Sequence, residues 1–211
     1  SYDLENACRK LKDKIEKESV IIPILNGVDI YQRVRAVIDT GYVLPGCVYM
    51  NAFVKQPGVI KHMSGNLFVY GKDPLYKDYY PMEVVEFLNG IPDVTFRWED
   101  DPYQAIWEKY MFVAAYALVT AYSRRTLRNV YDDAELKRNV IEIIKEIMEI
   151  AVRKGYSFPP DIVESLTARA GKLPYEATTS YQRDIQTGKN EGELFGETII
   201  RMGKESDVAT P

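Results

Sequence analysis

Histidine and cysteine are the residues that this chain has least of, and their scarcity removes several kinds of catalytic centre. The 211 residues include one histidine, His62, and two cysteines, Cys8 and Cys47, without a CxxC spacing. A His-rich metal centre or a structural zinc site cannot be built from so few ligands, so we expect no bound metal. A disulfide framework is equally unexpected. We therefore expect free thiols in a reducing, cytoplasmic location.

A surplus of positive charge and a long apolar run are also missing. The 27 lysines and arginines are outnumbered by 31 aspartates and glutamates, which gives a net charge of -4. This balance provides no electrostatic footprint for nucleic acid or for an anionic membrane surface. No run of about 18 apolar residues occurs, so no membrane-spanning helix is expected. The sequence thus predicts neither a nucleic-acid partner nor a membrane.

The composition that remains, 46% hydrophobic and 27% charged, is typical of a globular protein. In its first part, the apolar run VIIPIL (20–25) predicts a strand buried on both faces. This run lies between an amphipathic helical pattern over 3–18 and a second helical segment within 26–38, an order typical of a doubly wound α/β sheet. Short antiparallel strands are predicted between residues 46 and 71, where QPG and SGN mark turns.

The second part is predicted to be helical throughout. Residues 107–122 are apolar almost all round and predict a central, buried helix. Residues 134–155 repeat apolar side chains at the helical period and end in Lys-Gly, a helix stop. A final helix is predicted from about residue 190 to 206. We place the boundary so that 1–98 form an α/β part and 99–211 an all-α part.

Lys109 lies in the opening turns of the predicted central helix, next to apolar neighbours. Val113, Tyr116 and Ala117 follow it at helical spacing. Burial would lower the pKa of this lysine, because it disfavours the ammonium, and such a lysine suits proton donation to a reacting oxygen. The alternative is a lysine whose ammonium reaches water near a helix end, which composition alone favours.

Residues 178–196, TTSYQRDIQTGKNEGELFG, gather polar groups beside the last helix. Their first part predicts a short helix that carries Ser180. Asn190 can cap the following helix with Glu193 as its capping-box partner, which leaves Glu191 free for another role. Complementing the helix dipole is an equally good explanation for these glutamates.

Asn26 directly follows the predicted buried strand, in an Asn-Gly pair. In an open α/β sheet, ligands bind in the crevice outside the carboxyl ends of the strands. An Asn-Gly pair is also a favourable turn. A binding role and a purely structural turn therefore both stay open for Asn26.

Four segments of this chain, in order, resemble the ketopantoate reductase (2-dehydropantoate 2-reductase) family. They are PILNGVDIYQRV, GCVYMNAFVKQPGVIKHMSGN, IWEKYMFVAAYALVTA, and TTSYQRDIQTGKN continued by GETIIRMGKESDVATP. The W-x-K that opens the central helix and the S-x-x-x-D helix followed by G-K are the most specific parts. The resemblance implies a partial Rossmann-like NADP-binding domain over 1–98 and a helical, 6-phosphogluconate-dehydrogenase-like substrate domain over 99–211. It also implies NADPH-dependent reduction of ketopantoate to pantoate in pantothenate and coenzyme A biosynthesis.

The same resemblance implies roles for individual residues. Lys109 matches the catalytic lysine, the general acid that protonates the keto oxygen. Ser180 matches the serine that hydrogen-bonds the substrate carboxylate, and Asn26 matches the strand-end asparagine near cofactor and substrate. The glutamate of the family falls on Glu191 or Glu193, and the capping argument favours Glu191. The expected ligands are a small keto acid and NADPH, and a homodimer is an open alternative to a monomer.

Two departures from the family pattern bear on function. The family presents asparagines four and eight residues after its lysine, whereas this chain has Val113 and Ala117, which removes hydrogen bonds worth about 1 kcal/mol each. No GxGxxG occurs, although nucleotide phosphates need that glycine turn at a helix N-terminus. We therefore expect a fragment of a reductase, without the N-terminal half of the cofactor domain and inactive by itself.

Two classes of function follow. The first is reduction of ketopantoate, or of a related 2-keto acid with a different side chain. The second is a non-catalytic helical module for binding or dimerisation, which Val113 and Ala117 favour. The first class predicts that Lys109, Ser180 and one of the two glutamates converge on one pocket.

Overall fold

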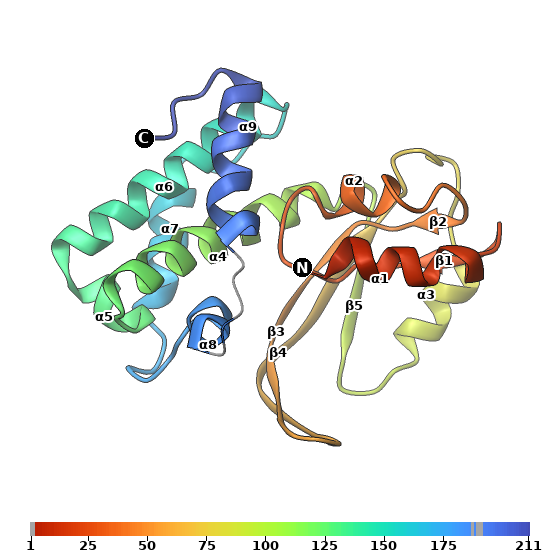
Figure 1. Cartoon of the computed structure of the whole chain (residues 1–211), viewed down its shortest axis with the longest axis horizontal. Coiled ribbons are helices and arrows are strands. Elements are labelled where there is room, and N and C mark those ends of the chain that lie inside the picture. Colours follow the sequence, from red (N-terminus) through yellow and green to blue (C-terminus); the bar gives the residue numbers. More distant parts are fainter. Residues whose placement is uncertain (1–2, 187, 189–191) are drawn as a thin grey trace. The chain divides into compact units, whose positions relative to one another are not determined.

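The computed structural model describes residues 3–186, 188 and 192–211 and shows a mixed α/β part followed by a helical part (Figure 1). The predicted class, α/β plus all-α, is confirmed. Two compact units, residues 3–106 and 107–211, divide the described chain. The division falls inside one long helix, later in the sequence than the boundary predicted at residue 98.

In the first unit, helices alternate with strands that form two small sheets. Its elements in chain order are α1 (Leu4–Leu11), η1 (Lys12–Lys14), β1 (Val20–Ile21), α2 (Ile30–Arg35), β2 (Tyr42–Val43), β3 (Gly46–Gln56), β4 (Val59–Gly71), α3 (Met82–Asn89) and β5 (Thr95–Glu99). β1 and β2 are parallel. β3 and β4 are antiparallel, and β5 extends that sheet as a parallel neighbour of β4.

The strand predicted over 20–25 is much shorter in the structure. β1 contains two residues, and both are half-buried rather than buried on two faces. Pro23 has no N–H to donate to a strand ladder. The Leu25 N–H donates instead to the Pro23 carbonyl at 3.0 Å, so the chain turns before it reaches Asn26.

β3 and β4 form one long hairpin, which corrects the prediction of short antiparallel strands. They span 11 and 13 residues. The connecting turn is Pro57-Gly58, and Gly58 has φ 79°, the conformation that the third position of a type II turn requires. The base of the hairpin pairs with β5 through residues 67–71. We call residues 51–64, beyond that base, the β arm.

The core of the first unit lies between β4, β5 and α3. Leu44, Tyr70 and Val85 are buried together, and half-buried apolar side chains pack around them. The Tyr70 ring stands edge-on to Trp98, with 5.4 Å between ring centroids. Aromatic pairs of this geometry add to the stabilisation from apolar burial, so the parallel β4–β5 pair is held by side chains as well as by its ladder.

The described residues of the second unit form helices and the loops between them. Its elements are α4 (Tyr103–Ser123, which begins in the first unit), α5 (Leu127–Asp132), α6 (Ala134–Arg153), α7 (Ile162–Ala170), α8 (Ser180–Gln186), the π-helical η2 (Glu193–Glu197) and α9 (Thr198–Ser206). α4 and α6 confirm the helices predicted over 107–122 and 134–155. The predicted final helix is divided in the structure between η2 and α9.

Apolar periodicity explains why α4 and α6 are at the centre of this unit. Met111, Ala114 and Tyr116 of α4 are fully buried. α6 buries one stripe at helical spacing, with Val140, Ile144, Ile147, Ile150 and Ala151. The Asp133 carboxylate caps its start by accepting hydrogen bonds from the backbone N–H groups of residues 135 and 136. Among the described helices, none combines the length and the apolar character needed to cross a membrane.

Candidate active site

Lys109 lies in the second turn of α4 and is half-buried. The next residue, Tyr110, is 2% exposed, and its hydroxyl donates hydrogen bonds to the carbonyls of Leu194 at 2.7 Å and Phe195 at 3.3 Å. Leu194 immediately follows Glu193. The turn of α4 that carries Lys109 is therefore tied to the turn of η2 that begins at Glu193.

η2 is a π-helical turn, and Glu193 is its first residue and is exposed. The Thr198 hydroxyl donates to the Glu193 carbonyl at 3.0 Å, and this bond holds the end of the wide turn to its beginning. Single π turns inside helices are rare and frequently occur at functional sites. Asn190 and Glu191 lie outside the described residues, so the preference for Glu191 over Glu193 stays a prediction.

Ser180 is the first residue of α8 and is half-buried. Its neighbour Tyr181 is buried, and the Tyr181 ring packs against the Phe195 ring with 5.5 Å between centroids. These contacts form one continuous cluster, which contains Tyr110, Tyr181, Leu194 and Phe195. Each of the three candidate residues, Lys109, Ser180 and Glu193, directly precedes a member of this cluster. We call this cluster the aromatic clamp.

Hydrogen bonds also hold the start of α8 to the last turn of α4 and to the loop that follows it. The Gln182 side-chain amide donates to the carbonyls of Thr120 at 3.2 Å and Arg125 at 2.9 Å. The Thr120 and Thr179 hydroxyl oxygens are 3.2 Å apart, and the Gln182 N–H donates to the Thr179 hydroxyl. Sequence reasoning missed these residues, although Thr179 three positions before Gln182 is a helix-start pattern that indicates a cap.

The face of α4 that carries Lys109 continues with apolar side chains. Val113, Ala117 and Thr120 follow Lys109 by four, eight and eleven residues, so they share its face of the helix. Val113 is half-buried and Ala117 is 1% exposed. The Thr120 hydroxyl donates to the Tyr116 carbonyl at 2.6 Å. The two turns after Lys109 therefore offer methyl groups, where an asparagine would offer hydrogen bonds.

Asn26 lies in the first unit, between β1 and α2, and is half-buried. Gly27 beside it has φ 126°, a conformation that residues with a Cβ rarely adopt. Within residues 3–106, this Asn-Gly turn is available to contact a nicotinamide cofactor, but no GxGxxG turn is present to bind the phosphates of the cofactor. The phosphate-bearing part of a dinucleotide therefore does not fit the residues that the structure describes.

A buried charge network, which the sequence analysis did not predict, lies in the first unit. Asp73 is 0% exposed, and its carboxylate forms an ion pair with Arg35. It also accepts hydrogen bonds from the Tyr31 hydroxyl and the Val43 N–H, both at 2.7 Å. Burial, followed by the bond to Asp73, raises the pKa of Tyr31 to about 12. The network holds α2 and β2 together, which gives it a structural role.

Family models match both parts of the chain. A model described as the C-terminal part of ketopantoate reductase PanE/ApbA matches residues 101–211, and a model of ketopantoate reductase PanE/ApbA matches residues 1–74. The chain belongs to the ketopantoate reductase family. This membership confirms the resemblance seen in the sequence, and the family is one of oxidoreductases.

The individual relatives have low sequence identity to this chain, but their alignments span all of it. An uncharacterised oxidoreductase of Bacillus subtilis and a 2-dehydropantoate 2-reductase of Aquifex aeolicus are each 26% identical over 100% of this chain and 70% of their own length. A dimeric ketopantoate reductase from Staphylococcus aureus matches with TM-score 0.84 and 20% identity, over 100% of this chain and 70% of that one. D-mandelate dehydrogenase with NADH and anilino(oxo)acetate matches with TM-score 0.86 and 17% identity, over 100% and 69%. The structural likenesses support the fold.

Proposed function

We propose that this chain carries the proton donor and the substrate-binding residues of a nicotinamide-dependent 2-keto acid reductase. Ketopantoate is the first candidate substrate, and NADPH is the proposed reductant. The reaction would belong to the cytoplasmic pathway to pantothenate and coenzyme A. Family membership and the 2-dehydropantoate 2-reductase relatives support this proposal. The aromatic clamp is the structural observation that carries it, because it joins the elements of Lys109, Ser180 and Glu193 within one unit.

In this proposal, each residue has one chemical task. The Lys109 ammonium donates a proton to the keto oxygen as the carbonyl carbon is reduced. The Ser180 hydroxyl donates a hydrogen bond to the substrate carboxylate. Glu191 or Glu193 accepts one from a substrate hydroxyl, because a carboxylate is an acceptor. The nicotinamide cofactor supplies the hydride, and Asn26 is assigned to cofactor binding.

A second candidate, a 2-keto acid with an apolar side chain, is favoured by the α4 face. Val113 and Ala117 cannot hydrogen-bond a hydroxylated substrate, and an unpaired buried hydroxyl costs about 1–3 kcal/mol. An apolar side chain loses nothing against the same methyl groups. The fold shared with D-mandelate dehydrogenase is consistent with such a substrate.

The deciding experiment measures NADPH oxidation with ketopantoate in a reductase polypeptide that contains this chain, which is called the parent. Lys109→Ala is compared with Lys204→Ala, which removes an exposed lysine of α9 in the same unit. Loss of the general acid lowers kcat by about 100-fold or more, while the Lys204 variant keeps the parent rate. Equal rates in the two variants would remove Lys109 from the mechanism.

A panel of 2-keto acids separates the candidates. Turnover with ketopantoate supports the first candidate. Turnover with an aromatic or branched 2-keto acid, without turnover of ketopantoate, supports the second. An inactive parent with NADPH and NADH on every acid overturns the reductase proposal and favours the non-catalytic module.

A further inference from the structure

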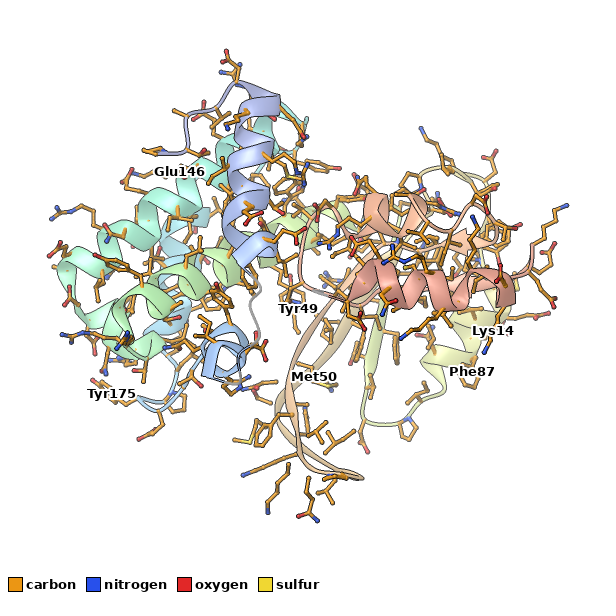
Figure 2. All side chains as sticks on the ribbon, viewed as in Figure 1. Lys14, Tyr49, Met50, Phe87, Glu146 and Tyr175 are labelled. Atoms are coloured by element: carbon orange, nitrogen blue, oxygen red, sulfur yellow. The ribbon has the colours of Figure 1, made fainter. Side chains whose placement is uncertain are left out.

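Arg183 lies on α8 three residues after Ser180, in the part of the helical unit to which substrate binding is assigned. Residues three positions apart on a helix share a face, with about 5–6 Å between their Cβ atoms. The loop before α8 lies at the surface of the unit, where Tyr175 is 57% exposed and projects outward (Figure 2). Arg183 is exposed as well. A small molecule can therefore reach Arg183 from solvent.

Hydrogen bonds hold the Arg183 guanidinium beside the start of α8. Its Nη1 donates to the Thr178 carbonyl at 3.0 Å and to the Thr178 hydroxyl at 3.2 Å. Thr178 lies two residues before Ser180 in the chain. The Arg183 side chain therefore turns back along the helix toward the end that carries Ser180, which is the usual direction of a long helical side chain.

The bonds to Thr178 leave one edge of the Arg183 guanidinium available. Both bonds come from Nη1, so within the described residues the N–H groups of Nε and Nη2 have no acceptor. A guanidinium is planar, and these neighbouring N–H groups point the same way. They match the two oxygens of a carboxylate and can bind both at once.

Arg183 also keeps its full positive charge, in contrast to other arginines of this unit. Arg128, Arg153 and Arg201 each form an ion pair with a carboxylate one turn away on their own helix. The partner of Arg183 is a neutral threonine, and no acidic residue of the described chain forms an ion pair with it. Arg183 is thus a cation that is held in place and not neutralised.

The other candidate residues leave the charge of an anionic substrate without a partner. Ser180 is neutral, and Lys109 is assigned to the keto oxygen. Asp184, four residues after Ser180 on α8, and Glu193, at the start of η2, are acidic. Like charges close together disfavour each other, whereas a cation favours a carboxylate beside it. A carboxylate at Ser180 therefore needs a cation such as Arg183.

From this geometry we infer that Arg183 binds the carboxylate of the 2-keto acid together with the Ser180 hydroxyl, through its Nε and Nη2 groups. The inference rests on the proposed function and adds a specificity-determining residue to it. Arg183 selects 2-keto acids that carry a free carboxylate over their neutral amides. It takes no part in the transfer of hydride or proton.

Calorimetric titration and steady-state kinetics of the parent test the assignment with two probes, ketopantoate and 3-methyl-2-oxobutanoate. Arg183→Gln raises Kd and KM by about 10- to 100-fold, because a charge-assisted hydrogen-bonded pair is lost. It leaves kcat close to the parent value, since the carboxylate is held alike in the ground state and the transition state. Arg183→Lys keeps the charge without the planar fork and gives an intermediate KM.

Arg138→Gln is the matched control, because it removes the charge of an exposed arginine of α6 in the same unit. It leaves Kd, KM and kcat unchanged. Circular dichroism of Arg183→Gln shows unaltered folding, since the Arg183 side chain is exposed.

The carboxamide of each acid separates substrate binding from a structural role. The amide is neutral, so it does not gain from the charge of the guanidinium. The parent and Arg183→Gln therefore reduce it with nearly equal kcat/KM. If Arg183 only holds the start of α8 through Thr178, the variant weakens acid and amide by the same factor.

The outcomes distinguish this inference from the proposed function. A parent that reduces a 2-keto acid, with an Arg183→Gln variant of the same Kd and KM, would overturn the role of Arg183 and leave the reductase proposal intact. Equal losses for acid and amide would also overturn it. Binding without turnover still measures the contribution of Arg183 through Kd. A parent that neither binds nor reduces any 2-keto acid overturns both.

Discussion

The Tyr110 hydroxyl donates a 2.7 Å hydrogen bond to the Leu194 carbonyl, 84 residues later in the chain. The bond connects the turn of α4 that carries Lys109 with the π turn that begins at Glu193. The bond holds the helical turn next to Lys109 in place, and Tyr110 itself is not assigned a contact with substrate. Tyr110 is therefore expected to act as a positioning residue.

Tyr110→Phe should destabilise the helical unit by about 1–3 kcal/mol, because it leaves buried carbonyl oxygens without their donor. Urea unfolding measures this change. Tyr122→Phe, on the same helix but 84% exposed, is the control and leaves the free energy of unfolding unchanged. In an active parent the Tyr110 variant should also raise KM more than it lowers kcat. Identical unfolding of the two variants would contradict the role of the clamp.

Ser180→Ala should raise KM for the keto acid by about 10- to 100-fold, because a hydrogen bond to a charged carboxylate contributes about 1.5–3 kcal/mol. Steady-state kinetics on the parent reductase measure this KM. Ser165→Ala, at an exposed position of α7, serves as the matched control. A KM that stays at the parent value would remove Ser180 from substrate binding.

Asp73→Asn should cost about 3–5 kcal/mol of stability, since it leaves the buried Arg35 guanidinium without its counter-ion. Asp100→Asn breaks the pair with Lys72, in which the Asp100 side chain is 80% exposed, and should leave stability unchanged. Thermal unfolding of both variants makes the comparison. Equal decreases in the melting temperature of the two variants would show that the Arg35–Asp73 pair contributes no more to stability than an exposed ion pair.

Alkaline pH should destabilise the first unit through Tyr31. The pKa of Tyr31 is raised from 10.0 in a free tyrosine to about 12 in the folded chain, first by burial and then by the hydrogen bond to Asp73. The folded state therefore holds the phenolic proton more tightly than the unfolded state does. The resulting stabilisation is fully present below pH 10 and is lost as the pH rises toward 12.

Urea titrations at several alkaline pH values measure this slope. Tyr31→Phe cannot ionise, so its free energy of unfolding should fall less steeply between pH 10 and 12 than that of the parent. Tyr122→Phe should keep the parent slope. A parallel decline in the Tyr31 variant and the parent would show that other groups cause the alkaline loss.

Local sequence determined the helical part of this protein. The all-round apolar character of 107–122 and the 3.6-residue stripe of 134–155 correctly predicted α4 and α6, because a helix satisfies its own backbone and its period is visible in the residues. Motifs in the same segments predicted the family, which the matching family models confirm. Lys109, Ser180, Asn26 and the glutamates were also selected from the sequence, and their roles stay predictions.

Tertiary structure decided the features that depend on contacts between residues far apart in the sequence. The strand expected over 20–25 is limited to Val20–Ile21, and the expected short strands are one long hairpin with a β5 neighbour. The Tyr110–Leu194 and Tyr31–Asp73 bonds join residues 84 and 42 positions apart. The periodicity of apolar residues in the sequence does not reveal such pairs. A strand ladder or a buried hydrogen bond requires a partner that only the folded chain brings into reach.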